Sequence, residues 1–174
     1  ISTSASPSRV TSTPAEIAAA SAPAMPALTA SATFDQGFRT VEYLAAAYLD
    51  MAWHTLEAPE SLDPVRFEQA AMDRIGLIPE IIPRYRSTYF AHIFAGGYAA
   101  GYYSYLWSEV LDADAFQAFR ETSLFDPGTA RRFREHILET GGSRPGMELY
   151  ERFRGREPVI GPLLERRGFV EPAH

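Results

Sequence analysis

The sequence predicts an all-α protein, and three observations support this prediction. Apolar residues recur with the period of a helix over residues 37–57. Asp-Pro pairs at 63–64 and 126–127 are typical of helix starts, because aspartate caps the first turn and proline is tolerated at its first position. No stretch of useful length alternates apolar and polar residues with the period of a strand.

Composition limits the classes of function open to the chain. The 174 residues suit one domain, and a hydrophobic fraction of 46% is enough for a sizeable core. A net charge of −6 without a long basic run argues against a nucleic-acid partner. No apolar run approaches the roughly 20 residues that span a bilayer, which argues against a membrane partner. The chain has no cysteine, so disulfides, thiolate metal ligands and a cysteine nucleophile are excluded.

Residues 1–33 differ in composition from the rest of the chain. They are rich in Ser, Thr, Ala and Pro and hold few large apolar side chains, so burial cannot offset the entropy of ordering them. We expect a flexible tail there and a folded helical domain over residues 34–174. The tail has neither the charged start nor the apolar centre of a signal peptide. The chain also starts at Ile1 rather than at methionine, which favours a processed or truncated product.

The first two helices are predicted from periodicity and from a cap. The helix over residues 37–57 is expected to bury much of its circumference. Its apolar stripe is formed by Phe38, Val41, Ala45, Tyr48 and Ala52 and is widened by Leu44, Leu49 and Trp53. After a loop, Asp63 caps a second helix. The buried face of this second helix is expected to hold Phe67, Ala71 and Ile75. The next stretch, "GLIPEIIPRYRS", contains two prolines and is predicted to be a turn-rich connection.

The second half of the chain is predicted to contain further helices. The stretch "YFAHIFAGGYAAGYYSYLWSEV" reads as helical on both sides of Gly96-Gly97, with one helix over residues 98–109. A separate short helix is expected to hold Phe116 and Phe119. The Asp-Pro pair at 126–127 starts a helix that ends at "ETGGS", where Gly141 can take the left-handed conformation. Two short helices, around "MELYERF" and "PLLERRG", close the chain.

Three tyrosines give the first indication of chemistry. On a helix, Tyr98, Tyr102 and Tyr105 lie at offsets of four and three residues and share a face. The glycine pair before them favours a bend or a mobile loop, since glycine weakens a helix by about 1 kcal/mol relative to alanine. A neutral phenol can donate a hydrogen bond to an oxyanion as it forms. Spacing alone leaves two alternatives open: tyrosines that face a ligand, and tyrosines that only fill a core.

The histidines form no recognisable metal site in the sequence. A zinc site of the "HExxH" kind needs two histidines four residues apart on a helix. Neither His54 nor His136 has such a partner, and both are expected to have ordinary surface or core roles. His174 is the last residue of the chain, and no Ser-His-Asp or phosphate-binding loop pattern occurs. The sequence therefore predicts no metal bound by this chain alone.

Three stretches match one family in order: "TFDQGFRTVEYLAAAYLDMAWHTL", "YRSTYFAHIFAGGYAAGYYSYLWSEVLDADAFQAF" and "SRPGMELYERFRGREPVIGPLLERRGF". They closely resemble the C-terminal part of the thimet oligopeptidase family of zinc metallopeptidases, most of all its bacterial peptidyl-dipeptidase (dipeptidyl carboxypeptidase) and oligopeptidase A branches. The likeness covers about residues 34–169, and the tail before about Met25 falls outside it. It implies the C-terminal portion of the catalytic domain of a mostly helical, two-lobed zincin-type clamp around a deep channel.

The resemblance also implies roles for individual residues. Tyr105 matches a phenol that hydrogen-bonds the oxyanion of the tetrahedral intermediate, and His92 matches a histidine that contacts the substrate or supports the same charge. Gly96-Gly97 and Tyr98 match substrate-binding positions, and Tyr102 is a weaker candidate of that kind. Substrates of the family are short peptides, and its peptidyl-dipeptidase branch removes C-terminal dipeptides.

The chain departs from the family pattern at the metal. In the family, zinc is held by the two histidines of "HExxH" and a glutamate on a following helix, all upstream of the region that this chain resembles. Zinc is therefore expected in the intact enzyme and not in this chain alone. Because the zinc activates the attacking water, we predict that the chain alone has no peptidase activity.

Two hypotheses about function follow. In the first, the chain is the substrate-binding and oxyanion-stabilising piece of a zinc oligopeptidase, and its partner is the upstream zinc-bearing part of the same protein. In the second, it is a non-catalytic helical peptide-binding or interaction module that pairs with a separate zinc-bearing chain. A fragment of a two-lobed protein is expected to expose apolar surface, and hence to self-associate or to pair tightly with the upstream fragment. A helical bundle with tyrosines only in its core fits the serial family motifs poorly. The compartment implied by the resemblance is cytoplasmic or periplasmic, in a GC-rich bacterium.

Overall fold

The computed structural model describes residues 31–57 and 62–170, which form helices joined by turns. The chain divides into two compact units, Ile1–Phe34 and Asp35–His174, and the helices named below belong to the second. No β-strand occurs over the described ranges, so the all-α prediction is confirmed. No helix in those ranges has the length and hydropathy needed to cross a membrane. The predicted tail, residues 1–33, lies outside the described residues except for its last three and stays a prediction.

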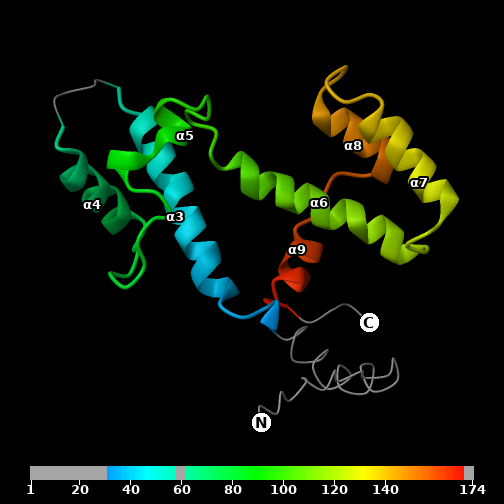
Figure 1. Ribbon diagram of the computed structural model, residues 1–174, viewed down its shortest axis with the longest axis horizontal. Coiled ribbons are helices and arrows are strands. Elements are labelled where there is room, and N and C mark those ends of the chain that lie inside the picture. The colour runs from blue at the N-terminus through cyan, green and yellow to red at the C-terminus, as the bar shows by residue number, and fades with distance from the viewer. Residues whose placement is uncertain (1–30, 58–61, 171–174) are drawn as a thin grey trace, which may run out of the picture. The chain divides into compact units, whose positions relative to one another are not determined.

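The helices follow one another along the second unit and are labelled in Figure 1. In chain order they are α3 (Gln36–His54), α4 (Pro64–Arg74), the 3₁₀ turn η1 (Ser87–Tyr89), α5 (Ala91–Phe94), α6 (Ser104–Glu121), α7 (Pro127–Phe133), the π-helical turn η2 (Arg134–Leu138), α8 (Gly146–Arg154) and α9 (Gly161–Arg166). The long helices α3 and α6 each pack against shorter ones: α4 contacts α3, and both α9 and α7 contact α6.

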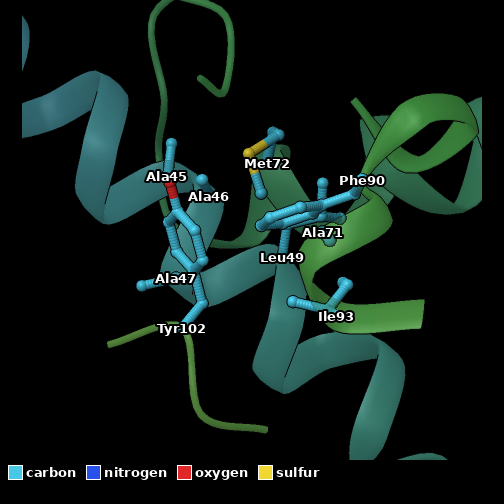
Figure 2. Packing of buried hydrophobic residues seen from close by; sticks show 9 residues of the cluster. All are labelled: Ala45, Ala46, Ala47, Leu49, Ala71, Met72, Phe90, Ile93 and Tyr102. Atoms are coloured by element: carbon cyan, nitrogen blue, oxygen red, sulfur yellow. The ribbon is translucent and has the colours of Figure 1, made fainter. Parts of the chain in front are cut away.

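The core around α3 is built on small residues. Ala45, Ala46 and Leu49 are at most 1% exposed. Figure 2 shows Phe90 and Tyr102 beside this part of α3, together with Met72 from α4. Alanines at these positions let the neighbouring segments approach the α3 backbone closely, which buries the larger rings.

The apolar stripe predicted for this helix is wrong in part. Ala45 is buried, but Phe38, Val41 and Tyr48 are exposed by 41%, 38% and 55%. The reason is that α3 is apolar around much of its circumference, whereas only part of that surface is covered within the chain. The α3 residues in the buried cluster are Ala45, Ala46, Ala47 and Leu49. An apolar face of α3 is therefore open to solvent in this chain.

The predicted start of α4 is confirmed. The Asp63 carboxylate accepts hydrogen bonds from the amides of Val65 at 2.9 Å and Arg66 at 3.0 Å, and proline occupies the first turn. Ile75, expected on the buried face, lies just past the end of the helix and is exposed. The connection over residues 77–86 contains no helix, as its prolines predict.

The tyrosine segment differs from the prediction of one helix over residues 98–109. Residues 98–103 form turns, and α6 begins only at Ser104. Gly97 and Ala100 have positive φ angles of 81° and 53°, and such residues cannot continue a right-handed helix. The separate short helix expected around Phe116 is also wrong, because α6 runs without a break to Glu121.

In the last third of the described chain, the helices lie close to their predicted positions. The Asp126 carboxylate accepts from the Thr129 amide at 2.6 Å, which confirms the predicted start of α7. After the π-helical turn, Gly142 has a φ of 77°, so it takes the left-handed conformation that was expected of Gly141. The two final helices, α8 and α9, lie where the sequence predicts them, and Leu163 of α9 packs on Val110 and Ala113 of α6.

Candidate functional site

The candidate site is centred on the tyrosine loop, residues 95–103, which joins α5 to α6. Gly96 and Gly97 of this loop are required by its geometry. A Cβ on Gly96 would lie 2.9 Å from the His92 carbonyl oxygen, and Gly97 has a left-handed φ of 81°. The Tyr98 amide donates to the same His92 oxygen at 3.0 Å. The chain therefore reverses tightly over His92 before it reaches the tyrosines.

Tyr98 and Tyr105 form an open aromatic pair. Their ring centroids are 5.0 Å apart with an interplanar angle of 27°, and each residue is 37% exposed. The two residues are brought together by the turn over residues 98–103 and the first turn of α6, and not by a shared helix face. The sequence thus predicts correctly that Tyr98 and Tyr105 are neighbours, but it predicts a single helix where the structure has a turn.

Tyr102 occupies a different environment from this pair. It is only 2% exposed, its ring stacks on Tyr43 at 5.1 Å, and it meets Phe90 edge-on at 4.9 Å. Its ring also contacts Tyr105 at 5.5 Å. Tyr102 therefore supports the open pair from the core side, which makes it a weaker candidate for direct contact with a substrate.

The protonation of the phenols suits hydrogen-bond donation. A tyrosine with an ordinary pKa near 10 is neutral at pH 7, and the neighbouring Tyr98 hydroxyl raises the pKa of Tyr105 further. Burial raises the pKa of Tyr102 to about 12. A neutral phenol donates one hydrogen bond without introducing a charge. Tyr105 is thus an exposed donor at the end of the tyrosine loop.

His92 lies underneath the loop among aromatic rings. Its ring centroid is 4.6 Å from that of Tyr85 and 6.3 Å from that of Tyr98. Its Nδ1 atom is buried and has no hydrogen-bond partner among the residues that the structure describes. A buried polar atom of this kind is uncommon and requires an explanation. The structure brings His92 next to Tyr98, and Tyr98 next to Tyr105.

Among the described residues, the other histidines do not take part in a cluster of potential metal ligands. His54 Nδ1 lies 2.8 Å from the Asp50 carboxylate, and His136 lies in the π-helical turn. No group of three or more His, Cys, Asp or Glu side chains within residues 31–57 and 62–170 is placed to hold a metal ion. His174 falls outside the described residues.

Sequence reasoning missed the residues that hold the tyrosine loop from below. Asp50 of α3 is fully buried and accepts hydrogen bonds from two loop amides. Tyr43 donates to the Tyr102 carbonyl oxygen at 3.3 Å, and Tyr85 packs beneath His92. One signal was available, because a carboxylate directly after Leu49 in an apolar helix indicates a buried charge that needs partners.

Raising the pH above 10 is expected to destabilise the fold through its buried tyrosines. Burial raises the pKa of Tyr43 and of Tyr102 above the ordinary value near 10. The unfolded chain loses these protons first, so the stability that they contribute is complete below pH ~10 and is lost as the pH rises through the folded pKa values. Urea unfolding at pH 8 to 11, followed by circular dichroism, should show a falling midpoint. A Tyr102→Phe variant should show a shallower fall, and an unchanged wild-type midpoint would contradict the expectation.

Comparison with known proteins gives the family. The profile of Peptidase family M3 matches residues 12–169, a range that starts upstream of the Met25 limit expected from the sequence. The chain is 47% identical over 137 residues to the dipeptidyl carboxypeptidase of Escherichia coli K12, which covers 78% of this chain and 20% of that protein. It is 58% identical over 81 residues to the oligopeptidase A of Haemophilus influenzae, covering 47% of this chain and 12% of that protein.

A plant relative extends the similarity beyond bacteria. The probable cytosolic oligopeptidase A of Arabidopsis thaliana is 40% identical over 148 residues, covering 82% of this chain and 21% of that protein. The chain thus spans about a fifth of the length of these longer matches. The predicted resemblance to dipeptidyl carboxypeptidase and oligopeptidase A is confirmed. Because the family profile covers nearly the whole described chain, the chain belongs to peptidase family M3.

Proposed function

We propose that this chain supplies the substrate-binding and oxyanion-stabilising part of a zinc-dependent oligopeptidase that removes C-terminal dipeptides or cleaves short peptides. Membership of peptidase family M3 supports the reaction class, and the name of the Escherichia coli relative supports the dipeptide product. The single observation that carries the proposal is the open Tyr98–Tyr105 pair, which stands at the end of a glycine loop and is exposed to solvent.

Each candidate residue has a role in this proposal. Tyr105 donates its phenolic proton in a hydrogen bond to the oxygen that becomes negatively charged when the peptide carbonyl is attacked. His92 contacts the substrate or supports the same charge. Tyr98 packs against Tyr105 and, with Gly96 and Gly97, binds the peptide. Tyr102 is retained as a weaker substrate-binding candidate because its ring contacts Tyr105.

The glycines suit peptide binding for a physical reason. The loop backbone at Gly97 has no side chain and is exposed, so an extended peptide can approach it closely. Tyrosine rings next to such a backbone provide apolar contact area and a polar end on the same side chain. A short peptide is therefore a chemically suitable occupant.

The described residues do not fit a zinc site. The family is zinc-dependent, but within the described ranges no cluster of metal-ligating side chains accompanies the tyrosines. We therefore derive no step through the metal from this chain. In the proposal, the upstream part of the protein brings the zinc, and the chain alone is inactive.

An open apolar face supports the need for a partner. A cavity of about 470 Å³ lies between α3 and the segment after α4, and its lining is apolar, including Val41, Tyr48 and Ile78. Val41, Tyr48 and Ile78 are more than a third exposed. Apolar patches of this kind mark interaction surfaces. The upstream part of the same protein is the proposed occupant, and the alternative is a separate zinc-bearing chain paired with this one as a non-catalytic peptide-binding module.

The function test compares the chain alone with a chimera. In the chimera, this chain replaces the matching segment of the Escherichia coli dipeptidyl carboxypeptidase. Each protein is incubated with zinc and a short acetylated peptide that has a free C-terminus, and products are identified by mass spectrometry. We expect dipeptide release by the chimera and none by the chain alone. Release by the chain alone that Tyr105→Phe abolishes would contradict its inactivity, and a folded but inactive chimera would contradict the proposed role.

Association of the isolated chain tests the apolar face. We expect concentration-dependent self-association in sedimentation velocity, and we expect Ile78→Glu to weaken it because a charge would enter the apolar cavity. Leu124→Glu is the matched control, since Leu124 is 56% exposed and Ile78 is 54% exposed, but Leu124 does not line that cavity. A monodisperse monomer at high concentration, or equal effects of both variants, would count against this surface.

A further inference from the structure

Asp50 is a buried charge on α3 that the proposed chemistry does not use. Its relative exposure is 0%, and the next residue toward the N-terminus, Leu49, is equally buried. A carboxylate is removed from water at a large cost unless hydrogen-bond donors replace the lost solvent. The identity of those donors therefore indicates why the charge is there.

Two of the donors are backbone amides of the tyrosine loop. The Ala100 amide donates to Asp50 Oδ1 at 2.9 Å, and the Tyr102 amide donates to Asp50 Oδ2 at 2.8 Å. Each carboxylate oxygen thus holds one amide of the loop. The His54 ring lies beside the carboxylate, one helical turn along α3, with Nδ1 2.8 Å from Oδ1 and 2.9 Å from the Asp50 carbonyl oxygen.

The loop conformation needs such a restraint. Ala100 has a φ of 53°, a left-handed conformation that an alanine rarely adopts. The Tyr102 peptide is held from its other end as well, because the Tyr43 hydroxyl donates to its carbonyl oxygen at 3.3 Å. Donors and acceptors of α3 therefore fix both the amide and the carbonyl of Tyr102.

We infer that Asp50 is a positioning residue whose carboxylate fixes the tyrosine loop and thereby sets the Tyr98–Tyr105 pair. The two anchored residues, Ala100 and Tyr102, lie between the two tyrosines in the sequence. Holding their amides on one carboxylate sets the course of the turn, and the turn sets the 5.0 Å separation of the rings. The catalytic consequence rests on the proposed function, whereas the anchoring of the loop does not.

Hydrogen exchange tests the anchoring directly on the 174-residue chain. In the wild type, the amides of Ala100 and Tyr102 should exchange more slowly than the nearby Ala99 amide, for which the described residues provide no acceptor. In Asp50→Asn both amides lose their charged acceptor, and the amide that faces the side-chain NH₂ loses its hydrogen bond as well. Exchange at Ala100 and Tyr102 should then accelerate about tenfold or more.

Glu68 provides a matched control within the same core. It is a second buried carboxylate, 4% exposed, and it accepts from the Ser87 amide at 2.7 Å and from Arg86, not from the tyrosine loop. In Glu68→Gln the amides of Ala100 and Tyr102 should still exchange more slowly than the Ala99 amide. If wild-type Ala100 and Tyr102 exchange as fast as Ala99, the inference is overturned without any variant. Equal acceleration of the loop by Glu68→Gln would also overturn it.

A double-mutant cycle in the chimera tests the consequence for the reaction. Asp50→Asn should lower kcat by about tenfold to a hundredfold with a smaller change in KM, since misplacing a catalytic group acts on the transition state. In a Tyr105→Phe background the same change should have little further effect, because Asp50 acts through Tyr105. Additive losses would indicate a general structural role and overturn the positioning role. Slow amide exchange in an inactive chimera would leave the anchoring supported and count against the proposed function instead.

Discussion

Replacing Tyr105 by phenylalanine is expected to lower kcat of the chimera by about a hundredfold to a thousandfold, the usual cost of removing one oxyanion donor. The substitution deletes a single hydroxyl and leaves a ring that can still stack on Tyr98 at about the same separation. The hydroxyl acts on charge that develops only in the transition state, so KM should change little. Steady-state kinetics on the acetylated peptide would separate the two parameters.

Tyr103→Phe is the matched control for this prediction. Tyr103 lies in the same tyrosine loop and is 54% exposed, but its ring makes no contact with the Tyr98–Tyr105 pair. Its loss of hydroxyl should leave kcat within about twofold of the wild type, as expected for an exposed group outside the site. If Tyr105→Phe keeps full kcat, or if both variants lose activity equally, Tyr105 is not the oxyanion donor.

Helix starts with local signals could be predicted from the sequence. Asp63 and Asp126 each cap a helix whose first turn contains proline, and all the groups involved lie within a few residues of each other. The helix α3 was also predictable from the sequence, but from the helical period of its apolar residues instead of from a cap. Local hydrogen bonds and apolar periodicity determine where these helices lie, so their positions can be predicted from the sequence.

The course of residues 98–103 could not be predicted in this way. Alanine favours helix, and nothing next to Ala100 in the sequence indicates a positive φ. Its amide donates to the carboxylate of Asp50, which lies 50 residues earlier in the sequence, on α3. A long-range contact thus overrides the local preference, and the tyrosines meet through a turn instead of along a helix.

The assignment of roles to the candidate site residues rests on the family resemblance and stays a prediction. Spacing placed Tyr102 on the same face as Tyr98 and Tyr105, whereas the structure buries Tyr102 and leaves the other two half-exposed. The roles proposed for His92 and Tyr105 come from position-by-position likeness to the family, which does not depend on the local geometry. Neither route identified Asp50, because its role depends on amides that approach it only in the folded chain.

Asp114→Asn is expected to lower the free energy of unfolding by about 3 kcal/mol, the low end of the cost of breaking a buried ion pair. Asp114 of α6 is fully buried. Its carboxylate accepts from the Tyr150 hydroxyl at 2.7 Å and from both terminal nitrogens of Arg156, at 2.6 and 2.8 Å. An asparagine of the same size would direct an NH₂ group toward these donors. The low end applies because Arg156 is partly exposed and can regain water.

The pH dependence distinguishes this charge from a simple packing effect. Burial alone would raise the pKa of Asp114, but the hydrogen bonds from Arg156 and Tyr150 outweigh it and hold the pKa below its ordinary value. The stability contributed by Asp114 is therefore complete above the unfolded pKa near ~3.9 and is lost as the pH falls through the folded pKa. Asp114→Asn should accordingly weaken the fold at pH 7 and flatten its acid-induced loss of stability.

Asp112→Asn on the same helix is the control, because it removes an exposed charge where Asp114→Asn removes a buried one. Asp112 pairs with Arg166 at 2.6 Å, but its side chain is 70% exposed, so its loss should cost less than about 1 kcal/mol. Urea unfolding of both variants at pH 7 and at pH 2, below the unfolded pKa of aspartate, measures the contrast. Because α8 and the segment after it are tied to α6 through Asp114, α8 should also lose hydrogen-exchange protection in Asp114→Asn and keep it in Asp112→Asn. Equal losses of stability in the two variants would mean that the Asp114 network does not hold α8 on α6.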